Sequence, residues 1–180
     1  MKIMKNINSA IMMLAFSSTL LAGNTKELKL TSPNGTQEIA FYQKQVSPSV
    51  NELYYRVDYK GNSVINESRA GLELDNRIWE MALGARDLKQ PACWMDNLEV
   101  DSVAYQRETN ITWHPLYGER STVHDHYKAA TLYLSKKDNS GYRLNIEVRA
   151  YDEGVAFRYF FPEHPKAIFH KVVGDLTEYT

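Results

Sequence analysis

The sequence predicts an all-β fold, either a sandwich or a barrel. The clearest segment is residues 142–162, where apolar side chains at 144, 146, 148 and 150 alternate with polar ones. This period of two is typical of a strand with one buried face. Asp152-Glu153-Gly154 then favours a tight turn, in which the glycine can supply a positive φ, and residues 155–161 run back. Similar short runs, separated by turn residues, fill most of the remaining chain.

Taken in order, the other expected strands are rich in β-branched and aromatic residues and are bounded by Gly, Pro, Asn or Ser. Turns are expected at residues 32–35, 60–62 and 136–141. Residues 123–134 fit a helix or a strand, and Thr131 to Leu134 favour the strand. The expected strands cover residues 27–30, 39–42, 53–59, 63–65, 71–74, 98–100, 105–113, 123–134 and 168–173.

Residues 77–91 are the one segment with a partly helical pattern. Ile78, Met81 and Leu88 fit the spacing of one helix face loosely, whereas Gly84 weakens a continuous helix. We expect a loop or a single short helix there.

Composition indicates one globular domain. The 180 residues are 43% hydrophobic and 24% charged, with a formal net charge of -1. This balance argues against a disordered chain and offers no basic patch for nucleic acid. Cys93 is the only cysteine, so no internal disulfide is possible, and its apolar surroundings predict a buried thiol.

The N-terminus, residues 1–22, reads as a signal peptide. Lys2 and Lys5 precede a short apolar stretch, and small residues follow at Ala22 and Gly23. The apolar stretch is shorter than the ~20 residues that a membrane span needs. We therefore expect an exported protein, periplasmic or extracellular, whose mature domain comprises residues 23–180 and begins near Asn24.

Two groups of polar residues suggest chemistry, and each has a simpler explanation. His124 and His126 share one face of the expected strand and, with His114, could hold a metal, but no tetrahedral ligand set is visible, so ordinary polar side chains are the stronger interpretation. Asp152 and Glu153 are adjacent on a turn and diverge, whereas glycoside hydrolysis needs two carboxyl groups facing each other across a sugar.

Aromatic residues could stack on sugar rings. The chain has twelve tyrosines and three tryptophans, Trp79, Trp94 and Trp113. In a β-protein each is more often part of the core. No phosphate loop, nucleophile elbow or zinc-binding helix motif is present. The residues alone thus predict an exported β-domain without a catalytic constellation.

Several motifs together resemble the N-terminal domain of glycoside hydrolase family 97. Their order and spacing cover nearly all of the mature chain, which makes the similarity fairly specific. The motifs are LTSPNG at 30–35, LYYRV at 53–57 with GLEL at 71–74, WHPLYGE at 113–119 followed by His126-Tyr127, and DEGVAFRY at 152–159.

This resemblance implies part of an exported bacterial α-glucosidase or α-galactosidase. Members are expected to have an N-terminal antiparallel β-super-sandwich of the galactose-mutarotase-like type, a central (β/α)8 barrel and a C-terminal β-domain. The barrel carries the catalytic carboxylates and most calcium ligands, and it acts on oligosaccharides or polysaccharides. The N-terminal domain packs on the barrel in cis and completes part of its pocket.

The chain departs from this pattern because it contains no barrel. It ends at 175–180, in what resembles a strand inside the domain, so we expect a super-sandwich truncated at its C-terminal end. The carboxylate that this domain lends to calcium is expected beyond that point. We therefore assign no catalytic residue, no cofactor-binding residue and no metal ligand, and expect neither bound calcium nor activity from this chain alone. The alternatives are a stand-alone carbohydrate-binding sandwich and an interaction module without a sugar ligand.

Overall fold

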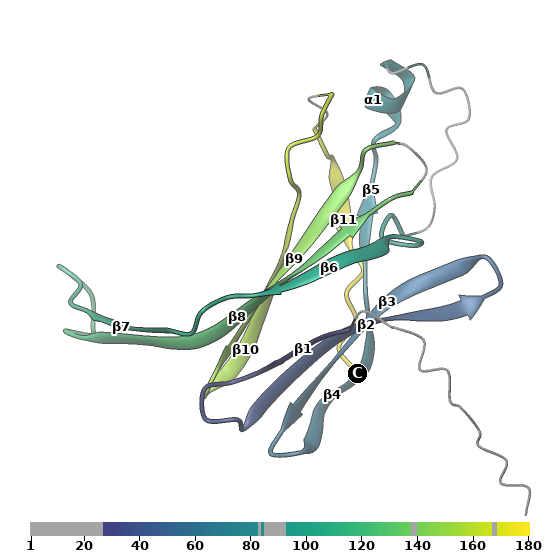
Figure 1. Cartoon of the computed structure of the whole chain (residues 1–180). Coiled ribbons are helices and arrows are strands. Elements are labelled where there is room, and N and C mark those ends of the chain that lie inside the picture. The colour runs from purple at the N-terminus through teal and green to yellow at the C-terminus, as the bar shows by residue number, and fades with distance from the viewer. Residues whose placement is uncertain (1–26, 83, 85–92, 138–139, 167–168) are drawn as a thin grey trace, which may run out of the picture.

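The protein is a β-sandwich in which two antiparallel sheets share one core (Figure 1). The computed structural model describes residues 27–82, 84, 93–137, 140–166 and 169–180. The predicted signal peptide, residues 1–22, lies outside these ranges. The all-β prediction is confirmed, and the architecture is a sandwich rather than a closed barrel.

The first sheet has the strand order β1-β2-β3-β4, so each strand pairs with its neighbour in the sequence. The strands after β1 are longer than the sequence pattern suggested; in β2 and β3, polar residues such as Gln43 and Lys44 continue the ladder beyond the apolar stretch. The strands are β1 (Leu28–Thr31), β2 (Gln37–Ser47), β3 (Val50–Tyr59) and β4 (Asn62–Ala70).

The second sheet has the order β10-β9-β8-β6, with β7 paired to another part of β8. A further small sheet joins β5 (Leu72–Leu74) to β11 (Val172–Asp175). The strands of the second sheet are β6 (Glu99–Tyr105), β7 (Thr109–Trp113), β8 (Val123–Ser135), β9 (Arg143–Tyr151) and β10 (Gly154–Phe160).

Side chains that alternate between the two faces of each strand account for the composition of the core. In β9 the side chains of Leu144, Ile146, Val148 and Ala150 are at most 1% exposed, whereas the residues between them face outward. They pack with inward-facing residues of the first sheet, including Phe41 and Tyr55. The β9–β10 hairpin is as predicted, with one difference. Gly154 lies opposite Tyr151 as the first residue of β10 and does not adopt a positive φ, so Asp152 and Glu153 alone form the turn.

Two other predicted elements need correction. Residues 105–113 are not one strand but the end of β6 and the whole of β7. Both strands pair with β8, and the pairing is interrupted over residues 106–108. The final strand is β11, later than the predicted 168–173, because its partner β5 sets its position. The segment 77–91, by contrast, contains a single short helix as expected, α1 (Arg77–Ala82). Residues 83 and 85–92 lie outside the described ranges.

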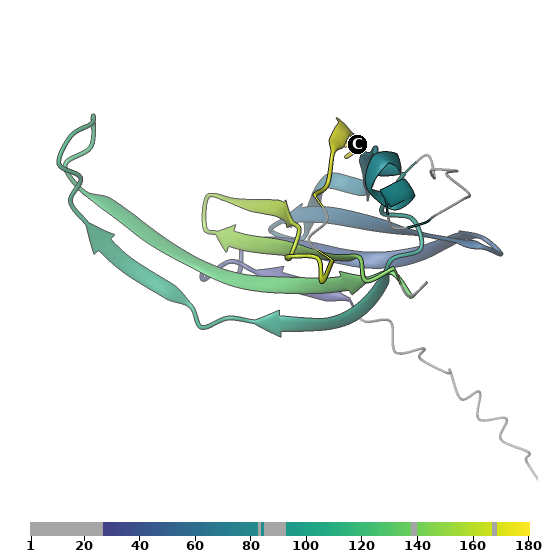
Figure 2. The ribbon, with the colours of Figure 1, turned by 90° about the horizontal axis from the view of Figure 1, so that it is seen from above.

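The most distinctive feature is an arm, residues 109–127, formed by β7, the following loop and the first part of β8. Figure 2 shows it as a curved two-stranded ribbon that projects from the sandwich. Isolated two-stranded ribbons are marginally stable in water.

Candidate functional site

The predicted histidine group lies on the arm. The His124 ring Nε2 is 3.0 Å from the Asn110 side-chain oxygen, and the His126 Nε2 is 2.7 Å from Glu108 Oε1. His114 contacts the Ser121 carbonyl instead, at 3.0 Å. Across the described ranges, no three His, Cys, Asp or Glu side chains cluster so as to hold a metal ion. These imidazoles are hydrogen-bonded polar side chains of the ribbon.

The two candidate carboxylates have a structural setting. The Asp152 side chain accepts a hydrogen bond from the Asn34 backbone N–H at 2.9 Å. This contact joins the β9–β10 turn to the turn between β1 and β2, which are far apart in sequence. Glu153 is exposed at the same turn. Neither Asp152 nor Glu153 lines either of the two hollows among the described residues that are considered below.

The tryptophans divide between core and surface. Trp94 is 2% exposed and packs edge-on against Tyr142, with ring centroids 5.8 Å apart. Trp113 is 48% exposed at the end of β7. Trp79 lies in α1, but its side chain is outside the described part of the structure. Of the described tryptophans, Trp113 is thus the one available to a ligand or partner.

Cys93 is fully buried, as predicted, and burial raises the pKa of its thiol. A thiol with a raised pKa is a poor nucleophile because little of it is ionised.

The described ranges also contain no helix with the length and apolar character needed to cross a membrane.

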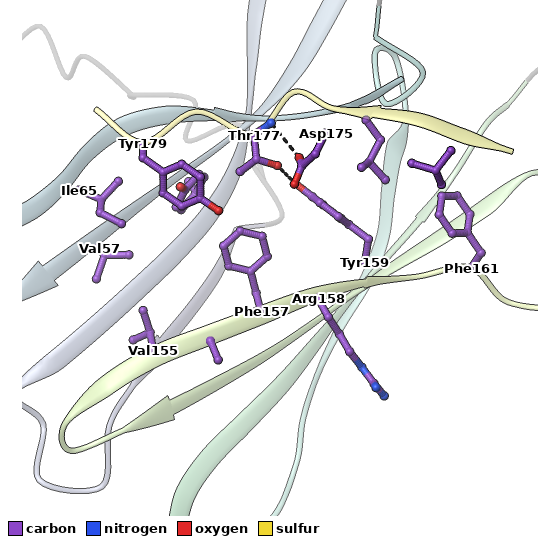
Figure 3. A pocket seen from close by; sticks show the side chains of 14 residues that line it. Val57, Ile65, Val155, Phe157, Arg158, Tyr159, Phe161, Asp175, Thr177 and Tyr179 are labelled. Atoms are coloured by element: carbon purple, nitrogen blue, oxygen red, sulfur yellow. Dashed lines mark hydrogen bonds between the residues drawn. The ribbon is translucent and has the colours of Figure 1, made fainter. Parts of the chain in front are cut away.

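A groove of about 680 Å³ opens between the sheets, beside the C-terminal segment (Figure 3). Its walls are mainly apolar and aromatic, and Arg158 points away from it. The residues that line it come from β3, β4, β5, β10 and the C-terminal segment: Tyr55, Val57, Ile65, Leu72, Val155, Ala156, Phe157, Arg158, Tyr159, Phe161, Val172, Asp175, Thr177 and Tyr179.

Three hydroxyl groups of this groove are already hydrogen-bonded. The hydroxyl groups of Tyr159 and Thr177 are 2.7 Å apart, and the Tyr55 hydroxyl donates to the Glu178 carbonyl at 2.7 Å. Burial raises the pKa of Tyr55 to about 12 and also raises that of Tyr159, so both remain protonated and neutral. Asp175 is the single carboxylate in the wall. The groove is therefore suited to apolar packing, not to acid–base chemistry that needs two carboxyl groups.

A smaller hollow of about 260 Å³ lies on the outward face of β9 and β10. Here Glu147 and Arg158 form an ion pair. The Arg149 guanidinium lies 4.5 Å from the ring centroid of Tyr127 and donates to the Tyr151 hydroxyl at 3.4 Å. Arg149 forms no salt bridge with any described residue. The hollow thus presents a positioned cation between two tyrosines, a set that sequence analysis did not single out.

The match to known proteins is specific for one domain. The family model described as "Glycosyl-hydrolase 97 N-terminal" matches residues 30–180. The chain belongs to this family. The resemblance inferred from the sequence motifs is therefore confirmed, and residues 30–180 form the N-terminal domain of this family.

Solved structures agree with the family assignment. A glycoside hydrolase family 97 enzyme from Pseudoalteromonas sp. strain K8, in complex with panose, is 28% identical with a TM-score of 0.66. A structure of the enzyme from the same organism in complex with acarbose has 27% sequence identity to this chain and a TM-score of 0.65. A β-arabinopyranosidase is 18% identical with a TM-score of 0.61, which supports the fold alone.

Each alignment covers most of this chain but only a small part of the solved enzyme. The alignment with the panose complex covers 84% of this chain but 20% of the other, and the acarbose complex gives the same shares. The family 97 N-terminal domain described here therefore spans about a fifth of the length of the solved family members that it matches. The region outside that fifth has no counterpart in this chain.

Proposed function

We propose that this domain is the N-terminal part of an exported family 97 α-glycosidase that hydrolyses α-glucosidic or α-galactosidic bonds. In this role it packs on a catalytic (β/α)8 barrel in cis and completes part of the carbohydrate pocket. The observation that supports the proposal is the family match over residues 30–180. It is joined by solved relatives in complex with panose and acarbose, of which the matched region is 20% of the length.

The described surfaces fit a supporting role. The larger groove is apolar and has one carboxylate, and the hollow on β9 and β10 contains one ion pair and one further arginine. Neither supplies the two facing carboxyl groups of a glycosidase. On this proposal the acid and base belong to the catalytic barrel.

Calcium is part of the same proposal, at the level of the whole enzyme. A calcium ion takes six to eight oxygen ligands, mostly from carboxylates and carbonyl groups. The described residues of this domain do not fit that requirement, because no suitable group of three acidic or histidine side chains exists among them. We therefore assign the ion no ligand in this chain. Export by the segment 1–22, to the periplasm or the extracellular space, completes the proposal.

A test compares the natural polypeptide that carries this sequence with a form lacking residues 24–180. We expect the natural protein to hydrolyse p-nitrophenyl α-glucoside or α-galactoside, and the shortened form to lose most of that activity. Circular dichroism must show that the shortened form is still folded. Full activity in a folded, shortened protein would show that this domain does not contribute to the pocket.

The second candidate function is a stand-alone carbohydrate-binding module, favoured by the exposed Trp113. Intact-mass measurement of the native protein separates it from the first. A species several-fold heavier than 20.7 kDa supports the multidomain glycosidase, whereas one at or slightly below that mass supports the binding module. In the second case, Trp113→Ala should abolish binding of oligosaccharides, and Val64→Ala on β4 should not.

A further inference from the structure

The side of β8 that carries apolar residues changes along the strand. In the body of the sandwich, Ala130, Leu132 and Leu134 point into the core. The same inward side continues toward the arm as Lys128, His126 and His124, which are polar. Strand side chains alternate strictly, so this change reflects a change of surroundings and not a change of register.

The opposite side of the ribbon is apolar in the arm. The register pairs Trp113 with Val123, and Ile111 with Asp125, so these residues share one face with Tyr127. We call this set the outer arm face: Ile111, Trp113, Val123 and Tyr127, with Asp125 as its charged member. Ile111 and Trp113 are both exposed. The inner face instead pairs Asn110 with His126 and Thr112 with His124.

The tip of the arm extends this apolar character. Leu116 is 99% exposed and Tyr117 is 89% exposed, the highest values among the large hydrophobic side chains of the described residues. An exposed apolar patch on a projecting ribbon is costly in water and marks an interaction surface. The sandwich itself cannot cover the outer arm face, because strand alternation places that face on the side of the sheet away from its core.

The base of the same face carries the positioned arginine. Tyr127 pairs with Thr109 of β7 and with Tyr151 of β9, so it connects the arm to the outward face of the second sheet. Arg149 lies over its ring. The surface therefore runs from an apolar tip to a cation held between two tyrosines. Such a surface fits a partner that is apolar over most of its area and offers a carboxylate at one end.

We propose that the outer arm face and the tip residues Leu116 and Tyr117 form the surface by which this domain docks on the catalytic part of its own polypeptide. This rests on the proposed function. Two observations point to the rest of the same polypeptide as the partner on this surface. The matched enzymes have about four-fifths of their length outside this domain, and the apolar face points away from this domain's own core. A partner in cis is always present, so it can keep such a surface covered.

Photo-crosslinking in the natural polypeptide tests the occupant. p-Benzoylphenylalanine would replace Tyr117 in one variant and Val64, a 63% exposed residue on β4, in a control. We expect position 117 to crosslink within the same molecule to peptides beyond residue 180, and position 64 not to. Crosslinks between two molecules, crosslinks only to residues 24–180, or no crosslink in a folded protein would each overturn the proposal.

A second experiment keeps this proposal separate from the proposed function. Trp113→Ser combined with Leu116→Ser should make the arm amides of the natural polypeptide exchange hydrogen roughly tenfold faster, and Val64→Ser should leave them unchanged. If the arm amides of the double variant exchange hydrogen at an unchanged rate, the arm is not the docking surface. The proposed function would still stand if deletion of residues 24–180 abolishes hydrolysis. Arm protection that appears only after adding oligosaccharide would overturn it in favour of a glycan.

Discussion

At the scale of residues, side chains that suggest chemistry are mostly used for packing. His170 lies against the Phe161 ring, with centroids 4.4 Å apart, and also contacts Trp94 and Tyr142. Asn76, which is fully buried, places its side-chain amide 3.4 Å from the ring Nδ1. This cluster holds the segment before β11 against the second sheet. The imidazole of His170, although it can take up a proton, is therefore used here as a packing group within an aromatic cluster.

The first prediction concerns pH. Burial lowers the pKa of His170 below its usual value of 6.5, and His164 adds to the effect. Below that usual value the unfolded chain therefore binds more protons than the folded one, so the free energy of unfolding falls as pH decreases. We expect a lower urea midpoint at about pH 5.5 than at about pH 7.5. The variant His170→Phe should lose part of this difference; an unchanged pH dependence would contradict the assignment.

A second prediction concerns Arg69, which joins β4 to the segment after Trp94. Its guanidinium contacts Glu52 at 2.9 Å and Asp96 at 2.7 Å, and all three side chains are at most 23% exposed. Arg69→Ala leaves two half-buried carboxylates unpaired, so we expect the free energy of unfolding to fall by about 2–3 kcal/mol. Urea denaturation measures this change.

The control for that experiment is Arg77→Ala. Arg77 pairs with Asp75, but its side chain is 58% exposed, so solvent screens the pair. We expect a clearly smaller loss of stability than for Arg69→Ala. Equal effects of the two substitutions would show that burial does not decide the strength of these ion pairs.

At the scale of elements, the C-terminal segment acts as a strap across the edge of the first sheet. The Leu176 N–H donates to the Gly71 carbonyl at 3.0 Å, and the Glu178 N–H donates to the Arg69 carbonyl at 2.9 Å. The Thr180 N–H donates to the Ser68 hydroxyl at 3.0 Å. The strap covers one end of the apolar groove and makes the β4 edge less available to other chains.

The third prediction follows from the space at Gly71. A β-carbon there would lie 3.1 Å from the Leu176 β-carbon and 3.2 Å from the Cys93 sulfur. Gly71→Val should therefore push the strap away and destabilise it by about 1–3 kcal/mol. Hydrogen exchange at the Leu176 and Glu178 amides would report the change. Gly154→Val is the matched control, because nothing lies within 4 Å of that position.

At the scale of the whole molecule, several surfaces are arranged for partners outside this domain. Strand β10 pairs with β9 on one side and forms an edge of its sheet. Beside it the apolar groove opens, and the arm projects with an apolar outer face. Open edges and apolar patches promote association between chains.

The fourth prediction is that residues 24–180 expressed alone are marginally stable and associate. Light scattering after size-exclusion chromatography should show a mass that rises with protein concentration. Ile111→Lys, which places a charge on the outer arm face, should reduce this association. A concentration-independent monomer that unfolds cooperatively would contradict the prediction.

Local patterns in the amino-acid sequence were enough to predict the β architecture, the β9–β10 hairpin and the family. Alternation in residues 144–151 is a local property, because each side chain's face follows from its position in its own strand. The sequence motifs are also local, and the family match confirmed what they indicated together. The burial of Cys93 and Trp94 agrees with their apolar neighbours in the chain.

Tertiary structure alone decided where those strands meet. The interruption at residues 106–108 appears only because β6 and β7 pair with successive parts of β8. Likewise, the groove brings together Tyr55, Tyr159 and Tyr179 from distant segments. The outer arm face depends on which strand pairs with which and in what register. Pairing and burial are long-range properties, set by contacts between residues far apart in sequence, so no local pattern in β8 reveals that its apolar side changes where the sandwich ends.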